Sequence, residues 1–454
     1  MQNPIELNLD QKRALETVFN LLTSEHSHAM VLSGVAGSGK TTLLSEVVKL
    51  ATGMGLKCRA LSPTGKAAKN LESKLNQLLP NTFTPFPVCT IHQYLYSLLT
   101  SGHYVLNPPM EKFDLLIVDE ASMISDAVTH NSYLQFGSGK LLTDLLTLVK
   151  NVYRQGDRPR PVKVLFVGDS FQLPPVNSNF APAMDVEYLT HHHQLSVINY
   201  HLTQAVRQAE GSGILTWANH IRDEMGRSRN RLLRVPFNDI DIRKTTARRA
   251  MEQLAAQDPL SDSCIAIVAT NIVAWEYNMA VRQLRCGNGY CELQVGEKLL
   301  VTRNAPSLRL SNGELVTVVE VSGPNMMELV TLNNGDQIAL TFRSVTLAVL
   351  QGTELAKVYA VVLENCLYEP LTERQLRQID EALRLLLSDP SYQTLYNQLL
   401  LVKFGYALTC HKAQGSEWPQ VIIDPTGIDT RTLEGKQWLY TAVTRSSCVL
   451  EVVA

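Results

Sequence analysis

Residues 34–42 read GVAGSGKTT, and this stretch decides the fold. It fits the pattern G-x-x-x-x-G-K-[ST], in which backbone N–H groups surround a phosphate while the lysine and the hydroxyl reach the β/γ-phosphates and Mg²⁺. An apolar run precedes it at 29–32, and a stretch with helical apolar spacing follows at 42–51. Strand, loop and helix in this order are what a phosphate-binding loop requires, because the helix N-terminus adds partial positive charge. The sequence therefore predicts a nucleoside triphosphate site with Lys40 and Thr41 at its centre.

The composition is typical of a globular chain. The 454 residues include 45% hydrophobic and 19% charged residues, and a length of this order suggests roughly two to four domains. No apolar run approaches the ~18 residues of a membrane span, and the N-terminus lacks the basic start and apolar core of a signal peptide. The eight cysteines contain no CxxC pair, which argues against a zinc site and a disulfide framework. We expect a cytoplasmic protein with free thiols and no membrane partner.

The net charge of −2 argues against attraction of the whole surface to nucleic acid. The basic residues are nevertheless unevenly distributed, since residues 47–110 contain the single acid Glu72 and six bases. A local basic face that binds phosphates and an ordinary solvated helix face explain this charge equally well. The six bases are Lys49, Lys57, Arg59, Lys66, Lys69 and Lys74.

Alternating apolar strands and helical stretches predict an open parallel α/β sheet in the first part of the chain. Strands are expected at 29–34, 58–63, 113–120 and 162–169, and each ends at a polar motif. Ligands bind beyond the carboxyl ends of the strands in such sheets, so the motifs indicate one shared site. Prolines and aromatic residues interrupt the pattern at 83–112, which we interpret as a small insertion with a hairpin around Ser101 and Gly102.

A second α/β unit is expected from about residue 196, with a core strand at 264–270. From 294 the pattern changes to short alternating segments with Asn-Gly turn signals, which predict a small β-barrel-like insertion at 294–350. A leucine-rich helical stretch follows at 371–402. We interpret 128–160 as a long solvated connection.

Two of the predicted strand ends carry candidate catalytic residues. Asp119 and Glu120 follow the apolar run LLIV, and we expect Asp119 to orient Mg²⁺ and Glu120 to act as general base on water. An ordinary acidic strand end is the alternative. Gln172 follows the strand at 162–169, and its amide can donate to a γ-phosphate oxygen and accept from the attacking water.

Eight ordered segments together resemble the motif set of superfamily 1 helicases, and are most similar to the group that includes RecD-type helicases and the phage helicase Dda. The resemblance runs from Leu9 to Arg445. It implies movement 5′ to 3′ along single-stranded DNA that crosses two RecA-like domains closing on ATP and Mg²⁺. The segments are GVAGSGKTT, LSPTGKAAK, TIH, IVDEAS, GDSFQLPPV, LTQAVRQ, HKAQGSEW and YTAVTR.

The resemblance also implies an α/β fold class with an insertion in each of the two P-loop NTPase domains. A pin-like insertion at 83–112 has Phe86, His103 and Tyr104 as candidate pin residues. An SH3-like β-barrel and a helical arm occupy 294–403, with the arm at 351–403. The two parallel-sheet domains then comprise 1–82 with 113–195, and 196–293 with 404–454.

For ATP, the resemblance implies that Gln11 reads adenine and that Glu417 binds the ribose. A glutamine amide can pair with N6 and N7 of adenine, whereas an exposed helix residue is the alternative for Gln11. Arg207 and Arg445 match two arginine fingers, and a surface arginine in a salt bridge is the alternative for each. Phosphate-loop residues expected to bind ATP are Gly34, Ala36, Gly37, Ser38, Gly39, Lys40, Thr41 and Thr42.

For DNA, the matching positions are hydroxyls, amides and a few cations, which hold phosphates without reading sequence. A packed structural histidine is the alternative for His92 and His411. The run His191–His193 has no counterpart in the family, and we interpret it as a solvated loop rather than a metal site. The DNA-binding candidates are Ser62, Pro63, Thr64, Lys66, Thr90, His92, Thr409, His411, Lys412 and Gln414.

The leading hypothesis is an ATP-driven 5′→3′ DNA helicase of a bacterial cytoplasm, or of a phage in its host. A protein-displacing translocase with weak unwinding is one alternative. An ATP-gated DNA-binding accessory subunit of a recombination or repair complex is another, although such a clamp needs no complete hydrolytic set. Expected partners are single-stranded DNA and ss/ds junctions, with single-strand-binding, replication or recombination proteins as further candidates, and a monomer is expected. RNA remains an alternative strand, because contacts to phosphates and stacked bases do not select DNA.

Overall fold

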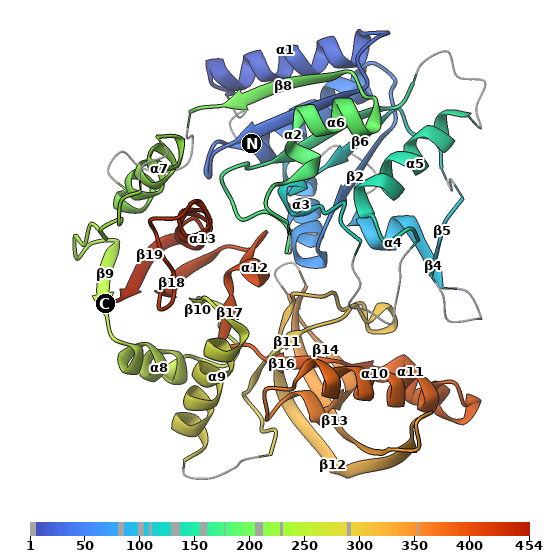
Figure 1. The fold of residues 1–454 in the computed structure, drawn as a ribbon, viewed down its shortest axis with the longest axis vertical. Helices are drawn as coiled ribbons and strands as arrows, with labels where there is room; N and C mark the ends of the chain where they lie inside the picture. Colours follow the sequence, from blue (N-terminus) through green and yellow to red (C-terminus); the bar gives the residue numbers. More distant parts are fainter. Residues whose placement is uncertain are drawn as a thin grey trace. The chain divides into compact units, whose positions relative to one another are not determined.

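The computed structural model describes residues 6–79, 86–98, 104–108, 111–128, 137–154, 161–176, 178–204, 212–227, 230–287, 292–351 and 354–454 (Figure 1). The chain divides into two compact units, Met1–Ser212 and Gly213–Ala454. Within the described ranges, every helix is too short or too polar to span a membrane.

The first unit is built on a six-stranded parallel sheet with the order β3-β2-β6-β7-β1-β8. All six residues of β1 and all six of β7 are buried, as expected for parallel strands that helices cover on both faces. This confirms the predicted α/β sheet. The strands are β1 (Ala29–Gly34), β2 (Cys58–Ser62), β3 (Val88–Thr90), β6 (Leu115–Val118), β7 (Lys163–Gly168) and β8 (Val197–Leu202).

Two hydrophobic cores lie on the opposite faces of this sheet. Along β1, Met30 and Leu32 belong to one core, and Ala29 and Val31 belong to the other, because successive side chains of a strand alternate. The first core includes side chains from the three helices α1 (Leu9–Thr23), α2 (Lys40–Gly53) and α3 (Gly65–Leu78). The second includes side chains from α4 (Ile91–Leu95), α5 (Leu141–Arg154) and α6 (Val186–His193).

Helix α5 corrects the interpretation of 128–160 as a solvated connection. Leu142, Leu145, Leu146 and Val149 are buried in the second core at helical spacing. The basic residues of this segment suggested a solvated connection, but the apolar stripe of the helix forms part of the core.

The predicted insertion at 83–112 contains a hairpin but begins later than expected. The strands β4 (Tyr96–Leu98) and β5 (Tyr104–Leu106) pair antiparallel, as expected for a hairpin, whereas Ser101 and Gly102 at its predicted turn lie outside the described residues. However, β3 within the same range pairs in parallel with β2 and belongs to the main sheet. The hairpin is anchored to α5, since the Tyr96 hydroxyl donates to Asp144 over 2.8 Å in a buried hydrogen bond.

The boundary expected near residue 196 is also wrong. Strand β8 pairs in parallel with β1, from Ala29 with Val197 to Gly34 with Leu202, so it completes the first sheet. The two units divide at residue 212 instead. An apolar strand pattern predicts a strand but does not say which sheet it joins.

The second unit contains a five-stranded parallel sheet with the order β17-β10-β18-β19-β9. Its strands are β9 (Ile242–Thr245), β10 (Cys264–Val268), β17 (Ala407–Thr409), β18 (Trp418–Asp424) and β19 (Ser446–Val453). The helices of this part are α7 (Gly213–Gly226), α8 (Ala247–Ala256), α9 (Asn271–Cys286), α12 (Cys410–Ala413) and α13 (Leu433–Val443).

A second sheet of this unit, mainly antiparallel, has the order β15-β14-β13-β12-β11-β16. Helix α10 (Glu373–Leu387) covers it, with Ile379 and Leu383 packed against Leu340 and Phe342. The helical arm expected over 351–403 is therefore wrong at its start, because 354–363 forms a strand. The remaining elements are β11 (Lys298–Val301), β12 (Leu315–Thr331), β13 (Gln337–Gln351), β14 (Glu354–Leu363), α11 (Gln393–Gln398), β15 (Leu399–Leu400) and β16 (Val402–Phe404).

Candidate nucleotide and nucleic-acid sites

The parallel strands of the first unit bring its predicted site residues to one edge of the sheet. Since the strands run in the same direction, their carboxyl ends meet there. Ser62 at the end of β2 is the register partner of Thr90 at the end of β3. Asp119 follows β6, which pairs with the other side of β2. The candidate strand contacts therefore lie next to the candidate catalytic acids.

The phosphate loop has the backbone conformation that its glycines allow. Gly37 and Gly39 have φ angles of 75° and 76°, in the left-handed region that glycine tolerates. The Lys40 ammonium donates to the carbonyls of Gly34 and Val35 over 2.7 and 3.1 Å. Neutral carbonyls do not compensate its charge, so a phosphate would be a stronger acceptor.

The surroundings of the two candidate acids, Asp119 and Glu120, are energetically unfavourable. Burial, followed by the charge of Glu120, raises the pKa of Asp119 to about 7. Glu120 has φ 52°, a left-handed conformation that non-glycine residues rarely adopt and that costs about 1–3 kcal/mol. Close by in sequence, the Ser122 hydroxyl is buried without a hydrogen-bond partner. A bound cation would relieve the carboxylate, and the acid and hydroxyl oxygens of Asp119 and Thr41 are ligands that Mg²⁺ prefers.

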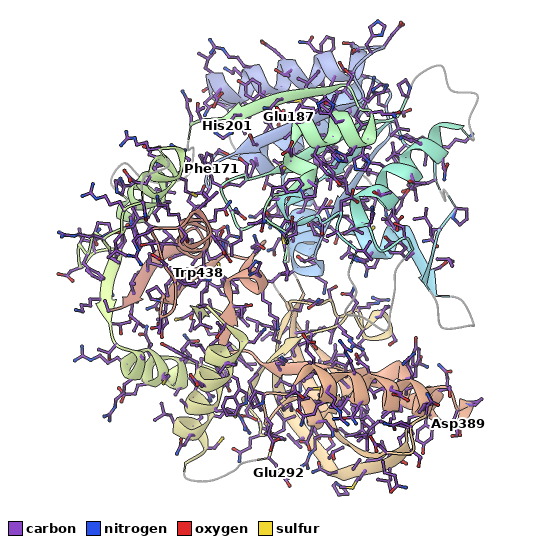
Figure 2. All side chains as sticks on the ribbon, viewed as in Figure 1. Phe171, Glu187, His201, Glu292, Asp389 and Trp438 are labelled. Atoms are coloured by element: carbon purple, nitrogen blue, oxygen red, sulfur yellow. The ribbon has the colours of Figure 1, made fainter. Side chains whose placement is uncertain are left out.

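Gln172 is placed after β7 at the same edge. It is 5% exposed, and its Oε1 is buried without a hydrogen-bond partner, as expected for an atom that waits for a ligand or a water. The preceding Phe171 packs edge-on against His201, whose Nδ1 lies 2.8 Å from the Ser33 hydroxyl (Figure 2). These contacts connect the loop of Gln172 to β8 and β1.

Gln11 is buried, 2% exposed, which excludes the alternative of an exposed helix residue. Its Oε1 accepts from the Asn8 N–H and its Nε2 donates to the Ser38 carbonyl over 3.2 Å. The amide therefore joins α1 to the phosphate loop. Each of its two polar atoms retains one further hydrogen-bonding position, so adenine recognition stays a prediction.

The DNA-binding candidates of the first unit include two helix caps and a buried hydroxyl without a hydrogen-bond partner. Thr64 caps α3 through Ala67, and Thr90 caps α4 through Gln93. Ser62 is fully buried and its hydroxyl has no hydrogen-bond partner. Burial lowers the pKa of His92, which favours its neutral form. Pro63 and Lys66 are half-buried beside these residues.

In the second unit, Arg445 is a buried cation held by neutral acceptors. It is 6% exposed, and its guanidinium donates to the carbonyls of Thr441 and Ser416 and to the Thr444 hydroxyl over 3.0–3.1 Å. These contacts exclude the alternative of a surface salt bridge. The other finger candidate, Arg207, lies outside the described residues.

The remaining candidates follow β17 in and after α12. Thr409 begins this helix without a side-chain cap hydrogen bond. Burial lowers the pKa of His411, and burial together with the charge of Lys403 lowers the pKa of Lys412 to about 8. Gln414 is buried, whereas Glu417 is exposed in the turn before β18.

Asn278 on α9 positions this segment, and nothing in its sequence context indicated such a role. Its Oδ1 accepts from the N–H groups of Tyr406 and Ala407 over 2.8 and 2.9 Å, and its Nδ2 donates to the Ala407 carbonyl. The side chain is 6% exposed. It therefore fixes the start of β17, which ends at Thr409.

Replacing Asn278 with alanine is expected to lower the free energy of unfolding by about 2–4 kcal/mol, because two buried N–H groups lose their acceptor. Urea denaturation measures this loss. Glu276→Ala, at an exposed position of the same helix, should change it by less than about 0.5 kcal/mol. An equal effect of both substitutions would contradict the positioning role.

Among the candidate pin residues, Phe86 is corrected. It is half-buried and packs against the first core before β3, with its N–H bonded to Asn76. It therefore belongs to the sheet edge rather than to the hairpin. His103 and the side chain of Tyr104 lie outside the described part.

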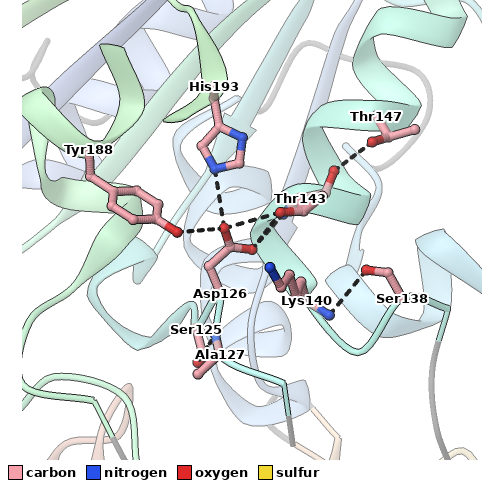
Figure 3. Close-up of polar contacts among 9 residues, drawn as sticks. All are labelled: Ser125, Asp126, Ala127, Ser138, Lys140, Thr143, Thr147, Tyr188 and His193. Atoms are coloured by element: carbon pink, nitrogen blue, oxygen red, sulfur yellow. Dashed lines mark hydrogen bonds and ion pairs between the residues drawn. The ribbon is translucent and has the colours of Figure 1, made fainter. Parts of the chain in front are cut away.

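The histidine run is the last turn of α6 rather than a solvated loop, and it takes part in a polar cluster around Asp126 (Figure 3). His193 Nε2 lies 3.2 Å from Asp126 Oδ2, which also accepts from the Tyr188 hydroxyl over 2.8 Å. Thr143 of α5 donates its N–H and hydroxyl to the same carboxylate. Burial lowers the pKa of His193, although Asp126 opposes this. Asp126 thus connects the segment after the candidate catalytic acids to two helices.

Comparisons with known proteins agree with this arrangement. The AAA domain family matches residues 6–132, and the UvrD-like helicase C-terminal domain family matches residues 404–452. The ATP-dependent RecD2 DNA helicase of Deinococcus radiodurans is 25% identical over 406 residues, which are 87% of this chain and 42% of that protein. The ATP-dependent DNA helicase Pif1 of Psychrobacter sp. is 25% identical over 429 residues, 87% of this chain and 61% of that protein. The chain thus spans less than two thirds of the length of either relative.

Solved structures show the same fold over nearly the whole chain. Bacteroides Pif1 bound to ssDNA has a TM-score of 0.52 at 18% identity, covering 99% of this chain and 93% of that chain. Pif1 helicase from Candida albicans has a TM-score of 0.51 at 19% identity, covering 99% and 94%. At this identity the likeness concerns the fold. In its two matching family models and its relatives, the chain is similar to helicases of the RecD2 and Pif1 type, and it shares the fold of the solved Pif1 structures.

Proposed function

We propose that this protein is an ATP-dependent 5′→3′ DNA helicase, which moves along single-stranded DNA through ATP-driven closure of its two RecA-like units and separates duplex. The observation that carries this proposal is the common sheet edge of the first unit. There Ser62 ends β2, which lies between β3, ending at Thr90, and β6, which is followed by Asp119 and Glu120.

Hydrolysis needs charge neutralisation, an oriented water and a base, and the chain supplies each. Lys40 and the N-terminus of α2 attract the phosphates. The Gln172 amide orients the water, and Glu120 accepts its proton. Mg²⁺, which Thr41 and Asp119 would hold, supplies charge compensation at the phosphates when bound.

Coupling to the strand has a direct path in the first unit. The Asp119 N–H donates to the carbonyl of Leu61 over 3.0 Å, immediately before Ser62. A shift of the segment after β6 therefore moves the end of β2, where the strand is expected to bind. The second unit contributes Arg445, whose buried and uncompensated guanidinium is suited to transition-state charge.

The names of the relatives support the proposed helicase activity. RecD2 and Pif1 are both named ATP-dependent DNA helicases, and a Bacteroides Pif1 structure contains ADP-AlF3 and ssDNA. We extend these properties to this chain, with ATP and Mg²⁺ as nucleotide and metal. Single-stranded DNA and ss/ds junctions are the proposed partners of a monomer.

Unwinding of partial duplexes with a 5′ or a 3′ tail, in DNA and RNA versions, tests the proposal. We expect ATP-dependent strand release from the 5′-tailed DNA substrate and little from the 3′-tailed one, with Lys40→Ala inactive on both. Release only from the 3′-tailed substrate would refute the direction, and release only from RNA would refute the strand. Removal of streptavidin from a biotinylated strand without unwinding would instead favour the protein-displacing translocase.

A further inference from the structure

A pocket lies within the second unit, between the start of α9, the segment 366–371 and the strands β16 and β17. It holds about 130 Å³ and is open to solvent. Its wall combines two cations, a hydroxyl and an apolar surface. The lining residues that matter here are Trp275, Pro370, Lys403, Thr409 and Lys412.

The two lysines of this pocket lack a counter-ion. Lys412 is half-buried and Lys403 is exposed, and no carboxylate of the described residues forms an ion pair with either one. Both burial and the charge of Lys403 lower the pKa of Lys412. The lining contains the acid Glu369, which is exposed and pairs with neither lysine. Holding two like charges together is unfavourable, and a bound anion would remove this cost.

The Thr409 hydroxyl beside the two lysines is also available to bind a ligand. Thr64 and Thr90 cap their helices with their side chains, whereas Thr409 occupies the same position of α12 without such a hydrogen bond. Thr409 can therefore donate to a ligand. Asn278, which also lines the pocket, has both amide atoms bonded to the backbone. Among the described lining residues, the donors without a hydrogen-bond partner include the two ammonium groups, this hydroxyl and the Asn271 side-chain amide, and ammonium and hydroxyl groups are suited to phosphate oxygens.

The apolar wall offers a ring face. Trp275 is half-buried, and its indole N–H is already bonded to the Tyr368 carbonyl over 3.3 Å. The polar atom is satisfied within the protein, so the ring carbons remain for stacking. Pro370 and Ile272 lie in the same wall, and Ile272 is 61% exposed.

We infer that this pocket receives one nucleotide of the single strand, with its phosphate at Lys403, Lys412 and Thr409 and its base against Trp275. The inference rests on the proposed function, and it adds Lys403 and Trp275 to the strand contacts. A bound phosphate would account for the two lysines, and a stacked base would account for the tryptophan beside them. Stacking on an aromatic ring accepts every base, as movement along any sequence requires.

Tryptophan fluorescence tests the wall. The other three tryptophans, Trp217, Trp418 and Trp438, are only 1%, 1% and 4% exposed, so quenching by oligo(dT) should report on Trp275. We expect quenching in the wild type and its loss in Trp275→Phe. We also expect Trp275→Ala to raise the Kd about 5- to 150-fold, the range for one stacked base. Undiminished quenching in Trp275→Phe would overturn the base position.

The salt dependence of oligo(dT) binding tests the cations. Lys403→Gln and Lys412→Gln should each reduce the slope of log K against log salt by about 0.7, the value for one phosphate contact on a single strand. Lys403→Arg should retain the slope because it keeps the charge. The matched control is Lys357→Gln, an exposed lysine that does not line the pocket. Equal slopes in Lys403→Gln and the control would overturn the role of Lys403.

Two further comparisons separate this inference from a free-phosphate site and from a failure of the proposed function. Inorganic phosphate should quench Trp275 far less than oligo(dT), since it lacks a base, and equal quenching would reduce the pocket to a free-phosphate site. If the wild type binds oligo(dT) but all pocket variants bind as it does, the pocket inference fails alone. If the wild type binds no single strand and its ATPase ignores DNA, the proposed function fails and the pocket inference with it.

Discussion

Replacing Glu120 with glutamine is expected to lower the rate of ATP hydrolysis about 10²–10⁴-fold while ATP and DNA binding persist. Glutamine keeps the size of the side chain and its hydrogen-bonding oxygen but cannot accept the proton of the attacking water. The backbone of residue 120 has a φ of 52°. The same surrounding contacts hold this conformation in the variant, so the loop should keep its geometry. Phosphate release and equilibrium binding of ATP measure the two properties separately.

The matched control is Glu187→Gln, an exposed carboxylate of α6 in the same unit, which should hydrolyse ATP at the wild-type rate (Figure 2). Loss of ATP binding in Glu120→Gln would show that Glu120 is a metal ligand or a structural residue instead. A rate within tenfold of the wild type would remove it from the role of base.

Replacing Arg445 with alanine is expected to remove most of the DNA-stimulated ATPase, by about 10³–10⁵-fold for a transition-state finger. Its guanidinium is buried and bonded to two carbonyls and a hydroxyl, so it has charge available for the γ-phosphate. DNA binding should change little, and ATP affinity only modestly, because such a group acts mainly on the transition state. ATPase rates with and without oligonucleotide measure the effect.

Two controls keep this prediction specific. Arg431→Ala removes an exposed arginine paired with Asp429, and should leave the stimulated rate unchanged. Arg445→Lys keeps the charge but lacks the planar fork, so a partial loss is expected. Alanine also removes the hydrogen bond from the Arg445 guanidinium to the Ser416 carbonyl. The thermal unfolding of each variant is therefore measured together with its ATPase rate. An ATPase that is indifferent to DNA in the wild type would refute the motor.

Several features of the fold and of the site could be predicted from local sequence alone. The phosphate loop depends on residues within a few positions of one another, and its glycines and the flanking strand and helix were recognisable for that reason. The apolar runs at β1 and β7 indicated strands of a parallel sheet. The acids after β6 and Gln172 after β7 were expected at one sheet edge because parallel strands end together. The fold class followed from these patterns and from the resemblance they carry.

The tertiary structure decided what depends on pairing between distant residues. The chain order does not say that β8 joins β1, that β3 belongs to the main sheet, or that 354–363 continues the antiparallel sheet. Nor does a local pattern show that Asp126 bonds to Thr143, Tyr188 and His193, which are separated from it by 17 to 67 residues.

The same holds for the nucleotide and strand sites. Gln11 contacts the loop 27 residues away, and the pocket joins Trp275 to Lys403 and Lys412 from distant parts of the chain. The sequence by itself predicted a phosphate-binding loop and determined where strands form, because those properties arise from neighbouring residues. Only the tertiary structure decided which segments meet, because that choice depends on burial and hydrogen bonding between residues that are remote in the chain.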